Sequence, residues 1–501
     1  MNNTKALKKD RLRVVLVNTV MILSVVLIVG VLILITMGYG INSDLNVERR
    51  GLVQFISHPS GATISINDET TSSRTPTKSM LLPGTHHITI NRPEYDTWSK
   101  SINVEPGSVL WLDYVRLIPT QKRTDHLKDF SDIISVSTSP KSQYMLALMS
   151  SPIAQFQLID LHSDNDIKYT AINPQKFFSG LAQADTVHTI EIHSWNVDSD
   201  KVLVKHRYGE SLEWIMLDLK NSDSSINLTN TFRMDFAHVS FSSNDGRRLF
   251  VLENGNFRTA DLSGKTISAV LIDDISTFSL IDKNVVIFTS DIEKSAHSQV
   301  GIYNEGEKGP TILYSTEYPT NGNAIGVVGG RFRDQDYAII SEGKKLLIMS
   351  GRNPSFGRLD STLILQKEIT LDFDIKHLEL SPLKRFVVAS NGNEVYSFDL
   401  ETLTGTHFQL SSDQQVTKFY WLDDFIIYTT SDNQLTIYDF DGLNRRSILD
   451  IKSNSTVALV PNEKFIYAFA PIIPTDPSSP SDNNIVNPVT TQFLRLHMVA
   501  R

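Results

Sequence analysis

One structural unit recurs along the C-terminal three quarters of this 501-residue chain. Each copy opens with a turn containing Pro, Asn or Asp and continues with an apolar strand, and in five copies a second strand ends in a closing tag, an Asp residue between apolar neighbours. The first apolar residues after the eight turns are Tyr144, Val202, Leu249, Val285, Tyr337, Phe386, Phe425 and Phe465. They span 321 residues in seven intervals, a mean near 46, which is typical of the blades of a β-propeller.

The closing tags follow the same repeat. Their acidic residues are Asp160, Asp218, Asp261, Asp399 and Asp439. We expect eight blades, with seven as the alternative because copies two, four and five are irregular. A β-helix would repeat every 20 to 25 residues or so, and the 3.6-residue periodicity of helical repeats is not visible. Residues 121–501 resemble the divergent TolB-like and WD-repeat-like β-propellers, although the Gly-His and Trp-Asp signatures of standard WD repeats are missing.

The N-terminus has a different character. Residues 1–13 carry a net charge of +4, and residues 14–38 contain no charged side chain. As a helix these 25 residues would extend about 37 Å, enough to cross a hydrocarbon core of about 30 Å. The run is too long for the apolar region of a cleaved signal peptide, and Gly38-Tyr39-Gly40 is a poor cleavage site. We therefore expect an uncleaved signal anchor; a cleaved signal and a buried core helix are the alternatives.

Charge and cysteine content suggest an orientation and a compartment. Five bases precede the span against Arg49 and Arg50 beyond it, so the positive-inside rule predicts a cytoplasmic N-terminus and an extracytoplasmic bulk. The chain has no cysteine, which excludes disulfides, thiol nucleophiles and cysteine metal sites. A disulfide-free exported protein suits a bacterial or archaeal surface. The net charge of −9 argues against nucleic acid as a partner.

After a linker at 39–50, residues 51–120 show five or six short alternating strands separated by Pro, Gly and Asn turns, which predicts a small β-sandwich. Its motifs are Pro59-Ser-Gly-Ala62, Arg74-Thr-Pro76, Leu82-Pro-Gly84 and Pro93-Glu-Tyr95 with Trp98. The segment resembles a PEGA domain, with Ser60 in place of the usual Glu and Glu94 in place of the expected Gly. The resemblance implies a surface module of poorly defined ligand, often placed between a membrane anchor and a larger extracytoplasmic domain.

Signatures of catalysis are missing. The sequence lacks the nucleophile elbow, the His-Glu-x-x-His zinc motif, the Gly-x-Gly-x-x-Gly fingerprint and the sialidase Asp box. Gly264-Lys-Thr266 lacks the first glycine of a P-loop and lies in a blade turn. Asp198-Ser-Asp200 and Asp439-Phe-Asp441-Gly442 could contribute to calcium sites, but Asp residues that cap turns are the favoured interpretation.

For the other polar and aromatic candidates a structural role is likewise the favoured interpretation. His86 and His87 would point to opposite faces of a strand, so they would not easily bind one metal. Trp195 and Trp421 precede blade turns, where an aromatic ring could stack on a sugar or a peptide, although core filling is favoured. The Pro-rich segment 471–488 is expected to be an exposed loop, favoured as a tolerated insertion over a contact element.

Together these features predict an all-β chain: a single transmembrane helix at 14–38 in the bilayer, a PEGA-like sandwich at 51–120 and a propeller at 121–501. We expect a membrane-anchored extracytoplasmic binding or scaffold protein that presents the propeller to a surface protein or an envelope polymer. We expect no catalytic residues, no cofactor and no metal, and the sequence does not assign the ligand-binding residues. The alternative is an extracytoplasmic hydrolase or lyase whose site is assembled from non-adjacent residues.

Overall fold

The computed structural model describes residues 3–36, 39–41, 47–131, 133–181, 186–292, 297–317, 325–352, 363–410, 419–453, 455–472 and 491–500. The chain divides into two units, Met1–Gln121 together with Val499–Arg501, and Lys122–Met498. Each unit is described by itself.

The first unit begins with a single long helix, α1 (Asn3–Thr36). Its window Leu16–Ile33 has a mean hydropathy of 2.8, and none of that window is buried. A helix of the soluble core would be buried, so that alternative is wrong; the helix is apolar and long enough to span a membrane. A short hairpin of β1 (Tyr39–Ile41) and β2 (Val47–Arg49) follows, with Tyr39 opposite Arg49.

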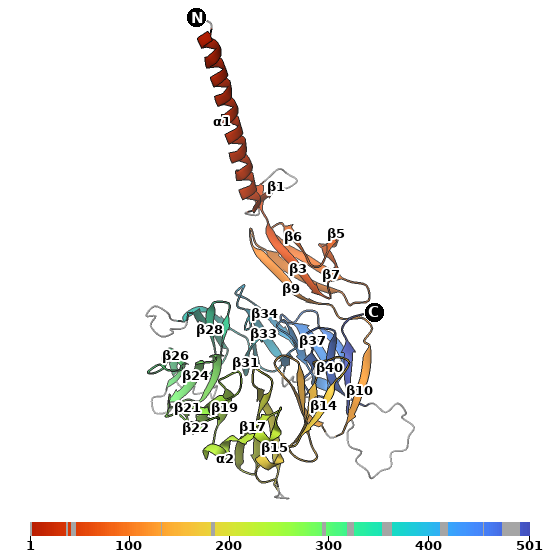
Figure 1. The fold of residues 1–501 in the computed structure, drawn as a ribbon, viewed down its shortest axis with the longest axis vertical. Coiled ribbons are helices and arrows are strands. Elements are labelled where there is room, and N and C mark those ends of the chain that lie inside the picture. The colour runs from red at the N-terminus through yellow and green to blue at the C-terminus, as the bar shows by residue number, and fades with distance from the viewer. Residues whose placement is uncertain are drawn as a thin grey trace. The chain divides into compact units, whose positions relative to one another are not determined.

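Residues 51–116 form two sheets (Figure 1). The three-stranded sheet has the order β6-β3-β9, and the four-stranded sheet has the order β5-β4-β7-β8. The strands are β3 (Gly51–His58), β4 (Thr63–Ile66), β5 (Glu69–Arg74), β6 (Thr77–Leu81), β7 (Gly84–Asn91), β8 (Trp98–Val104) and β9 (Val109–Arg116). Alternate residues of β3 are buried, so one face of its sheet packs into the core with Ile88, Ile90 and Trp98 of the other sheet.

The motif turns of this unit are tied to one another. The backbone N–H of Gly61 donates to the carbonyl of Thr75 at 2.7 Å, and the N–H of Ala62 donates to the Thr75 hydroxyl at 3.0 Å. Gly61 has φ of +84°, a conformation that glycine adopts without strain. Glu94 also has a positive φ, 69°, so the turn keeps the left-handed conformation although glycine is replaced there.

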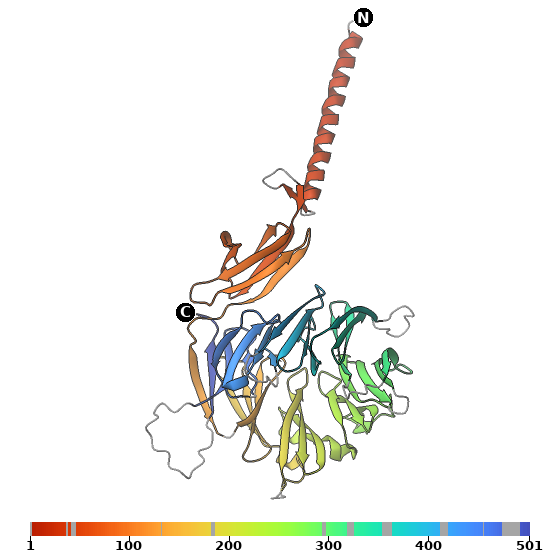
Figure 2. The same ribbon diagram turned by 180° about the vertical axis from the view of Figure 1, so that it is seen from behind.

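The second unit contains eight four-stranded antiparallel sheets among its described residues, arranged in a ring (Figures 1 and 2). Blade 1 consists of β11 (Ile133–Thr138), β12 (Tyr144–Met149), β13 (Gln155–Asp160) and β14 (Lys168–Ile172), and blade 2 of β15 (His188–Trp195), β16 (Lys201–Tyr208), β17 (Ser211–Asp218) and β18 (Ile226–Asn227). Blade 3 consists of β19 (His238–Phe241), β20 (Arg248–Glu253), β21 (Asn256–Asp261) and β22 (Thr266–Ile267), and blade 4 of β23 (Thr277–Asp282), β24 (Val285–Ile292), β25 (His297–Asn304) and β26 (Thr311–Glu317).

Blades 5 to 8 complete the ring. Blade 5 consists of β27 (Gly326–Phe332), β28 (Gln335–Glu342), β29 (Lys345–Gly351) and β30 (Ile364–Thr370), and blade 6 of β31 (His377–Leu380), β32 (Phe386–Ser390), β33 (Glu394–Asp399) and β34 (Thr404–Gln409). Blade 7 consists of β35 (Phe419–Trp421), β36 (Ile426–Thr429), β37 (Gln434–Asp439) and β38 (Arg446–Asp450), and blade 8 of β39 (Ala458–Leu459), β40 (Phe465–Pro471), β41 (Thr491–His497) and β10 (Thr124–Phe130). The short helices within the described residues are α2 (Leu228–Phe232), η1 (Gln175–Phe177), η2 (Ser222–Ser224) and η4 (Ser431–Asn433).

The ring is closed by strands from both ends of the unit. β10 pairs with β41, from Thr124 opposite Leu496 to Phe130 opposite Thr491, so the N-terminal strand is the outermost strand of blade 8. Figure 2 shows this orange strand beside the blue strands of the same blade. A parallel bridge between Val136 and Ser455 joins blade 1 to blade 8 at the first strands. Closure in this way ties the first and last strands of the unit together by backbone hydrogen bonds within one sheet.

Apolar residues fill the spaces between consecutive blades. One cluster joins Met145 and Ile159 of blade 1 to Tyr467 and Phe493 of blade 8. Comparable clusters join blades 1 and 2, 2 and 3, 3 and 4, 4 and 5, 5 and 6, and 6 and 7. The core is therefore a ring of similar interfaces, as expected for a repeat fold in which each unit packs on its neighbours.

The predicted propeller is confirmed, and the count is the eight blades expected first. Seven of the eight predicted positions lie in the second strands of the blades, β12, β16, β20, β24, β28, β32 and β40, and Phe425 lies just before the eighth, β36. The sandwich has seven strands, so the expected five or six is corrected. The strand least visible in the sequence, β5, is polar and almost wholly exposed, which removes the alternation on which strand prediction depends. The predicted loop 471–488 lies, beyond Ile472, outside the described residues.

Candidate functional site

Strand order assigns every loop of the propeller to one of two faces. Because each blade is antiparallel, the loops that join first to second and third to fourth strands open on one face, which we call face 1. The loops that join second to third strands, and each fourth strand to the next blade, open on the other, face 2. The first strands lie innermost, since β27 contacts both β23 and β31.

The larger candidate site is a cavity of about 690 Å³ on face 1, which we call the face-1 cavity. It lies at the ends of the first strands of blades 1, 6, 7 and 8. Its lining is Thr138, Ser139, Pro140, Lys141, Ser142, Glu379, Leu380, Pro382, Lys384, Phe419, Tyr420, Trp421, Leu422, Asp423, Asp424, Tyr428, Thr456, Val457, Leu459, Val460, Pro461 and Glu463. Segments more than 300 residues apart in the sequence therefore share one hollow.

The charged lining of the face-1 cavity is predominantly acidic, with four carboxylates and two amines. Burial lowers the pKa of the Lys384 ammonium, and the charges of Glu379 and Asp424 oppose this effect only in part. Burial raises the pKa of the Asp424 carboxyl, although the Leu383 N–H donates to its Oδ1 at 2.7 Å. Both groups are thus held where water screens them weakly, and a ligand of opposite charge would gain more there than on an open surface.

Aromatic rings form the apolar part of the same lining. The rings of Tyr420 and Tyr428 stack with centroids 5.2 Å apart, and Trp421 stacks on Phe386 at 6.5 Å. Tyr428 is buried, and its hydroxyl accepts the Val457 N–H at 3.1 Å. The Trp421 Nε1 is buried without a hydrogen-bond partner among the described residues. Carboxylates beside aromatic faces favour cationic side chains, which pair with the former and stack on the latter.

Local turn chemistry fixes the loops that carry these groups. The Ser381 hydroxyl accepts the Phe386 N–H at 3.1 Å, which sets the turn that places Lys384. Asp423 Oδ1 accepts the N–H groups of Phe425 and Ile426, each at 2.8 Å. Asp423 is thus a turn-capping residue, while its neighbour Asp424 is a half-buried carboxylate of the lining.

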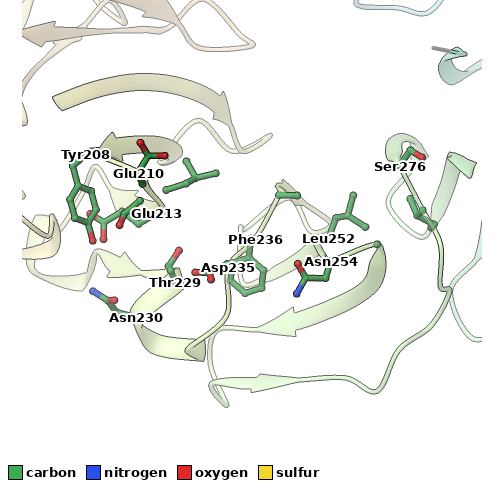
Figure 3. A pocket seen from close by; sticks show the side chains of 15 residues that line it. Tyr208, Glu210, Glu213, Thr229, Asn230, Asp235, Phe236, Leu252, Asn254 and Ser276 are labelled. Carbon is green, nitrogen blue, oxygen red and sulfur yellow. The ribbon is translucent and has the colours of Figure 1, made fainter. Parts of the chain in front are cut away.

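A second cavity of about 680 Å³ lies on face 2 between blades 2 and 3, which we call the face-2 cavity (Figure 3). Its charged lining residues are Glu210, Glu213 and Asp235. Figure 3 shows Tyr208, Glu210 and Glu213 on one side and Asp235, Asn254 and Ser276 across from them.

A buried relay of hydrogen bonds lies behind the face-2 cavity. His206 Nδ1 and Glu213 Oε1 are 2.8 Å apart, and His206 Nε2 and His188 Nδ1 are 3.0 Å apart. Asn227 Nδ2 donates to Glu213 Oε2 at 2.7 Å, and the Ser179 N–H donates to Oε1 at 2.8 Å. Burial by itself would raise the pKa of Glu213, but these hydrogen bonds, led by that of His206, lower it overall.

The relay determines which nitrogen of each ring carries a proton. A carboxylate at Glu213 holds the proton on His206 Nδ1, so His206 Nε2 accepts from His188 Nδ1. His188 Nε2 is then a bare acceptor, and it is buried with no partner among the described residues. This nitrogen is shielded from solvent, whereas Glu213, at the other end of the relay, lines the face-2 cavity.

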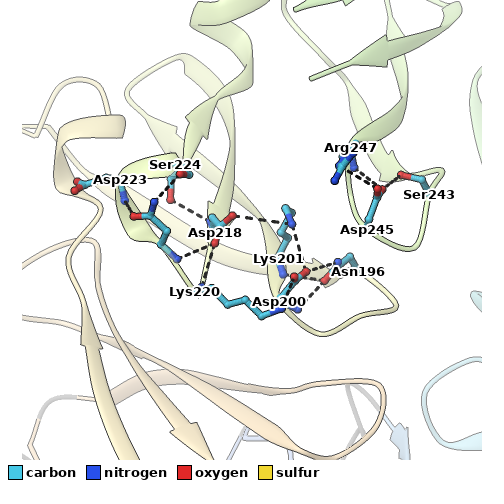
Figure 4. A network of polar contacts seen from close by, with 12 residues as sticks. Asn196, Asp200, Lys201, Asp218, Lys220, Asp223, Ser224, Ser243, Asp245 and Arg247 are labelled. Carbon is cyan, nitrogen blue, oxygen red and sulfur yellow. Dashed lines mark hydrogen bonds and ion pairs between the residues drawn. The ribbon is translucent and has the colours of Figure 1, made fainter. Parts of the chain in front are cut away.

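The carboxylates singled out in the sequence lie in turns. Asp200 accepts from Lys220 Nζ at 2.9 Å and from Asn196 Nδ2 at 2.7 Å (Figure 4). Burial by itself would raise the pKa of Asp200, but those hydrogen bonds and Lys201 lower it overall. Asn196 Nδ2 also donates to the Asn244 carbonyl of blade 3 at 2.9 Å. Asp439 Oδ2 accepts from Asn444 Nδ2 at 2.8 Å. Among the described residues no group of three His, Asp or Glu side chains could hold a metal ion.

Of the remaining candidate residues from the sequence, one lines a cavity and the others lie in turns, on a strand or between blades. His86 Nε2 lies 2.8 Å from the Leu82 carbonyl, whereas His87 Nδ1 lies 3.4 Å from the Ser101 hydroxyl, so the two rings have different surroundings. The Gly264 N–H donates to Asp261 Oδ1 in a hairpin turn. Trp195 Nε1 donates to Ser137 Oγ at 2.9 Å and packs between blades 1 and 2, while Trp421 lines the face-1 cavity.

Sequence reasoning missed the acidic and basic groups of the face-1 cavity. Glu379, Lys384 and Asp424 each stand within a few residues of the predicted blade positions Phe386 and Phe425. The signal that could have found them was the repeat itself: residues just before equivalent turns of different blades share a face, so their charges could have been grouped.

Residues 51–119 match the PEGA domain family. The resemblance inferred from the motif residues is therefore confirmed for that segment, and it supports a surface or scaffold protein. No curated protein matches the sequence.

Solved structures with a similar arrangement are β-propellers of varied kinds. An oligogalacturonate lyase in complex with manganese is 11% identical, covers 76% of this chain and 99% of its own, and has a TM-score of 0.38. A eukaryotic initiation factor is 12% identical over 67% of this chain and 94% of its own, with a TM-score of 0.38. PorZ of the type-IX secretion system of Porphyromonas gingivalis is 12% identical over 70% of this chain and 43% of its own, with a TM-score of 0.37.

Proposed function

We propose that this chain is a membrane-anchored extracytoplasmic binding or scaffold protein. In this proposal residues 1–13 are cytoplasmic, residues 14–38 cross the bilayer once, residues 39–50 link the anchor to the PEGA domain at 51–120, and residues 121–501 form the binding propeller. The apolar, unburied helix and the bases before it support the anchor and its direction.

The observation that carries the binding proposal is the lining of the face-1 cavity. Glu379 and Asp424 stand beside Tyr420 and Trp421 in a hollow shared by four blades. This combination fits a protein segment with Lys or Arg side chains, because a cation can pair with a carboxylate while its stem lies on an aromatic ring. We therefore favour a basic segment of a partner protein over an envelope polymer as the ligand.

The binding test uses the full chain in lipid nanodiscs and a fluorescent ten-residue Lys/Arg-rich peptide, with the same peptide carrying Glu instead as a control. The double variant Glu379→Gln/Asp424→Asn should weaken binding of the basic peptide at least roughly tenfold, since each substitution removes a negative charge but keeps an acceptor oxygen, so that two charge-assisted hydrogen bonds become neutral ones. Glu210→Gln, which removes an exposed carboxylate from the opposite face, should leave binding unchanged. Equal binding of the basic and acidic peptides would contradict the ligand class.

The nanodisc preparation also tests the enzymatic alternative, and cell membranes and intact cells test the anchor. Peptide and envelope polymers should be retained without being cleaved; turnover that one face-1 or face-2 substitution abolishes would overturn the binding proposal. Alkaline carbonate should leave the protein with the membrane, and protease added outside intact cells should digest the propeller. Release of the intact chain by carbonate would show that residues 14–38 are not an anchor.

A further inference from the structure

The outward face of the three-stranded sheet β6-β3-β9 carries an apolar patch. Met80 is 41% exposed and Val109 is 54% exposed, and both stand opposite the half-buried Leu52 in the strand register. Leu82, just past β6, is 41% exposed. We call these four side chains the sheet-end patch. Three strands thus present a contiguous apolar row, unlike single exposed apolar residues, which need no explanation.

The patch gives way to amphipathic side chains along the sheet. In the next row on the same face, two residues further along β3, Lys78 and Trp111 stand on either side of Gln54. Trp111 is 43% exposed. An apolar row followed by Trp and Lys reproduces the order of groups across a membrane–water interface, where Trp lies at the headgroups and Lys extends to water.

The covalent tether keeps this end of the sheet close to the anchor. Tyr39 lies three residues after the end of α1 at Thr36, and it is paired across the hairpin with Arg49. Arg49 is two residues before Gly51, the first residue of β3. Because the hairpin returns the chain, the path from Thr36 to Gly51 is at most about 25 Å. Leu52 of the patch is one residue further along β3.

We propose that the sheet-end patch docks into the headgroup–acyl boundary of the bilayer that α1 crosses. The occupant follows from position and chemistry: the patch is at the end of the domain where the chain arrives from the membrane, and its neighbours are Trp and Lys. The charged residues near this end of the sheet in sequence and strand register are nearly balanced, with Arg49, Arg50 and Lys78 against Glu48 and Glu105. Burial of apolar side chains therefore drives the docking, and electrostatic attraction to anionic lipid is not required. The PEGA domain is held against the membrane, not on a free tether.

This inference rests on the proposed anchor, and the experiment separates the two. Since the chain has no cysteine, single cysteines can be spin-labelled without background. Val109→Cys reports the patch, and Thr70→Cys on the exposed strand β5 is a β-branched control of similar size. Full-length protein is reconstituted in phosphatidylcholine vesicles, and only carbonate-resistant protein is measured, so a failed anchor is detected before the labels are read.

Collision of the spin label with oxygen reports a lipid environment, and collision of the label with a water-soluble nickel chelate reports exposure to water. At Val109→Cys the ratio of oxygen to nickel accessibility should exceed that at Thr70→Cys roughly fivefold, as expected for a group about 5 Å inside the boundary. Adding Trp111→Gln to Val109→Cys should lower the ratio, and adding anionic lipid should not change it.

Three results would overturn the proposal. Equal, water-like ratios at both positions would show a free domain. Low access of both reagents at Val109→Cys would show that protein covers the patch. Spin–spin broadening at that label would identify a second copy of this chain as the occupant.

Discussion

Replacing Phe130 with Ala should destabilise the propeller at its point of closure. Phe130 is the last residue of β10, 6% exposed, and its ring lies 5.6 Å from Phe469, 6.0 Å from Tyr169 and 6.5 Å from Phe493 between centroids. Truncating a buried Phe costs about 3–5 kcal/mol of unfolding free energy, because transferred surface is lost and a cavity remains. For a unit of roughly 380 residues the unfolding entropy converts this into a drop in Tm of about 4–6 °C.

The assay is thermal unfolding of full-length protein followed by circular dichroism at a strand wavelength, with Ile134→Ala as the control. Ile134 is the neighbouring apolar residue on β11, but it is 52% exposed, so its truncation should lower Tm by less than about 1 °C. Limited proteolysis should also cut near β10 earlier in the Phe130 variant. If both variants unfold within 1 °C or so of the wild type, closure by β10 does not contribute to stability as argued.

Two further predictions concern pH and backbone strain. Burial, reinforced by His193 and Lys205, lowers the pKa of His238 to about 4; the unfolded chain therefore binds more protons between pH 6.5 and 4, and the unfolding free energy should fall by up to about 3 kcal/mol as the pH drops through that window. Urea titrations at each pH should show this slope, and His238→Phe should flatten it; an unchanged slope would contradict the assignment. Gly442 has φ of +81°, and a Cβ there would lie 2.2 Å from the ring of Phe408, so Gly442→Ala should cost roughly 1–3 kcal/mol in the same titrations. Gly209→Ala, also at positive φ but in open space, should cost less, and equal losses would refute the steric part of the reasoning.

Much of the fold could be predicted because its signals are local. The positions from Tyr144 to Phe465 lie within the first three residues of the second strand in seven blades and one residue before it in the other, since a turn followed by an apolar run is readable without knowing what it packs against. The turn of the PEGA tetrapeptide was likewise visible, and Gly61 occupies the conformation its type suggests. β5 was not visible, because an exposed polar strand has no apolar alternation.

The candidate site was less accessible to sequence reasoning. Trp421 was noticed as an aromatic residue before a turn, yet its neighbours Lys384 and Glu379 belong to another blade and were not. Their proximity depends on strand length and twist around the ring, which no short window of sequence contains. The relay of His188, His206 and Glu213 lies within blade 2, and it was missed because strand register brings together residues from three adjacent strands.

The sequence by itself determined the apolar helix, the PEGA segment and a repeat near 46 residues, because each is written in the order and spacing of neighbouring residues. Only the tertiary structure decided that β10, from the beginning of the unit, is the outermost strand of blade 8. It likewise decided which charged residues line the face-1 cavity together. It also decided that Met80, Leu52 and Val109 form one outward row, since strand register couples residues that the chain separates. Local patterns fix elements; closure and register fix which side chains share a surface.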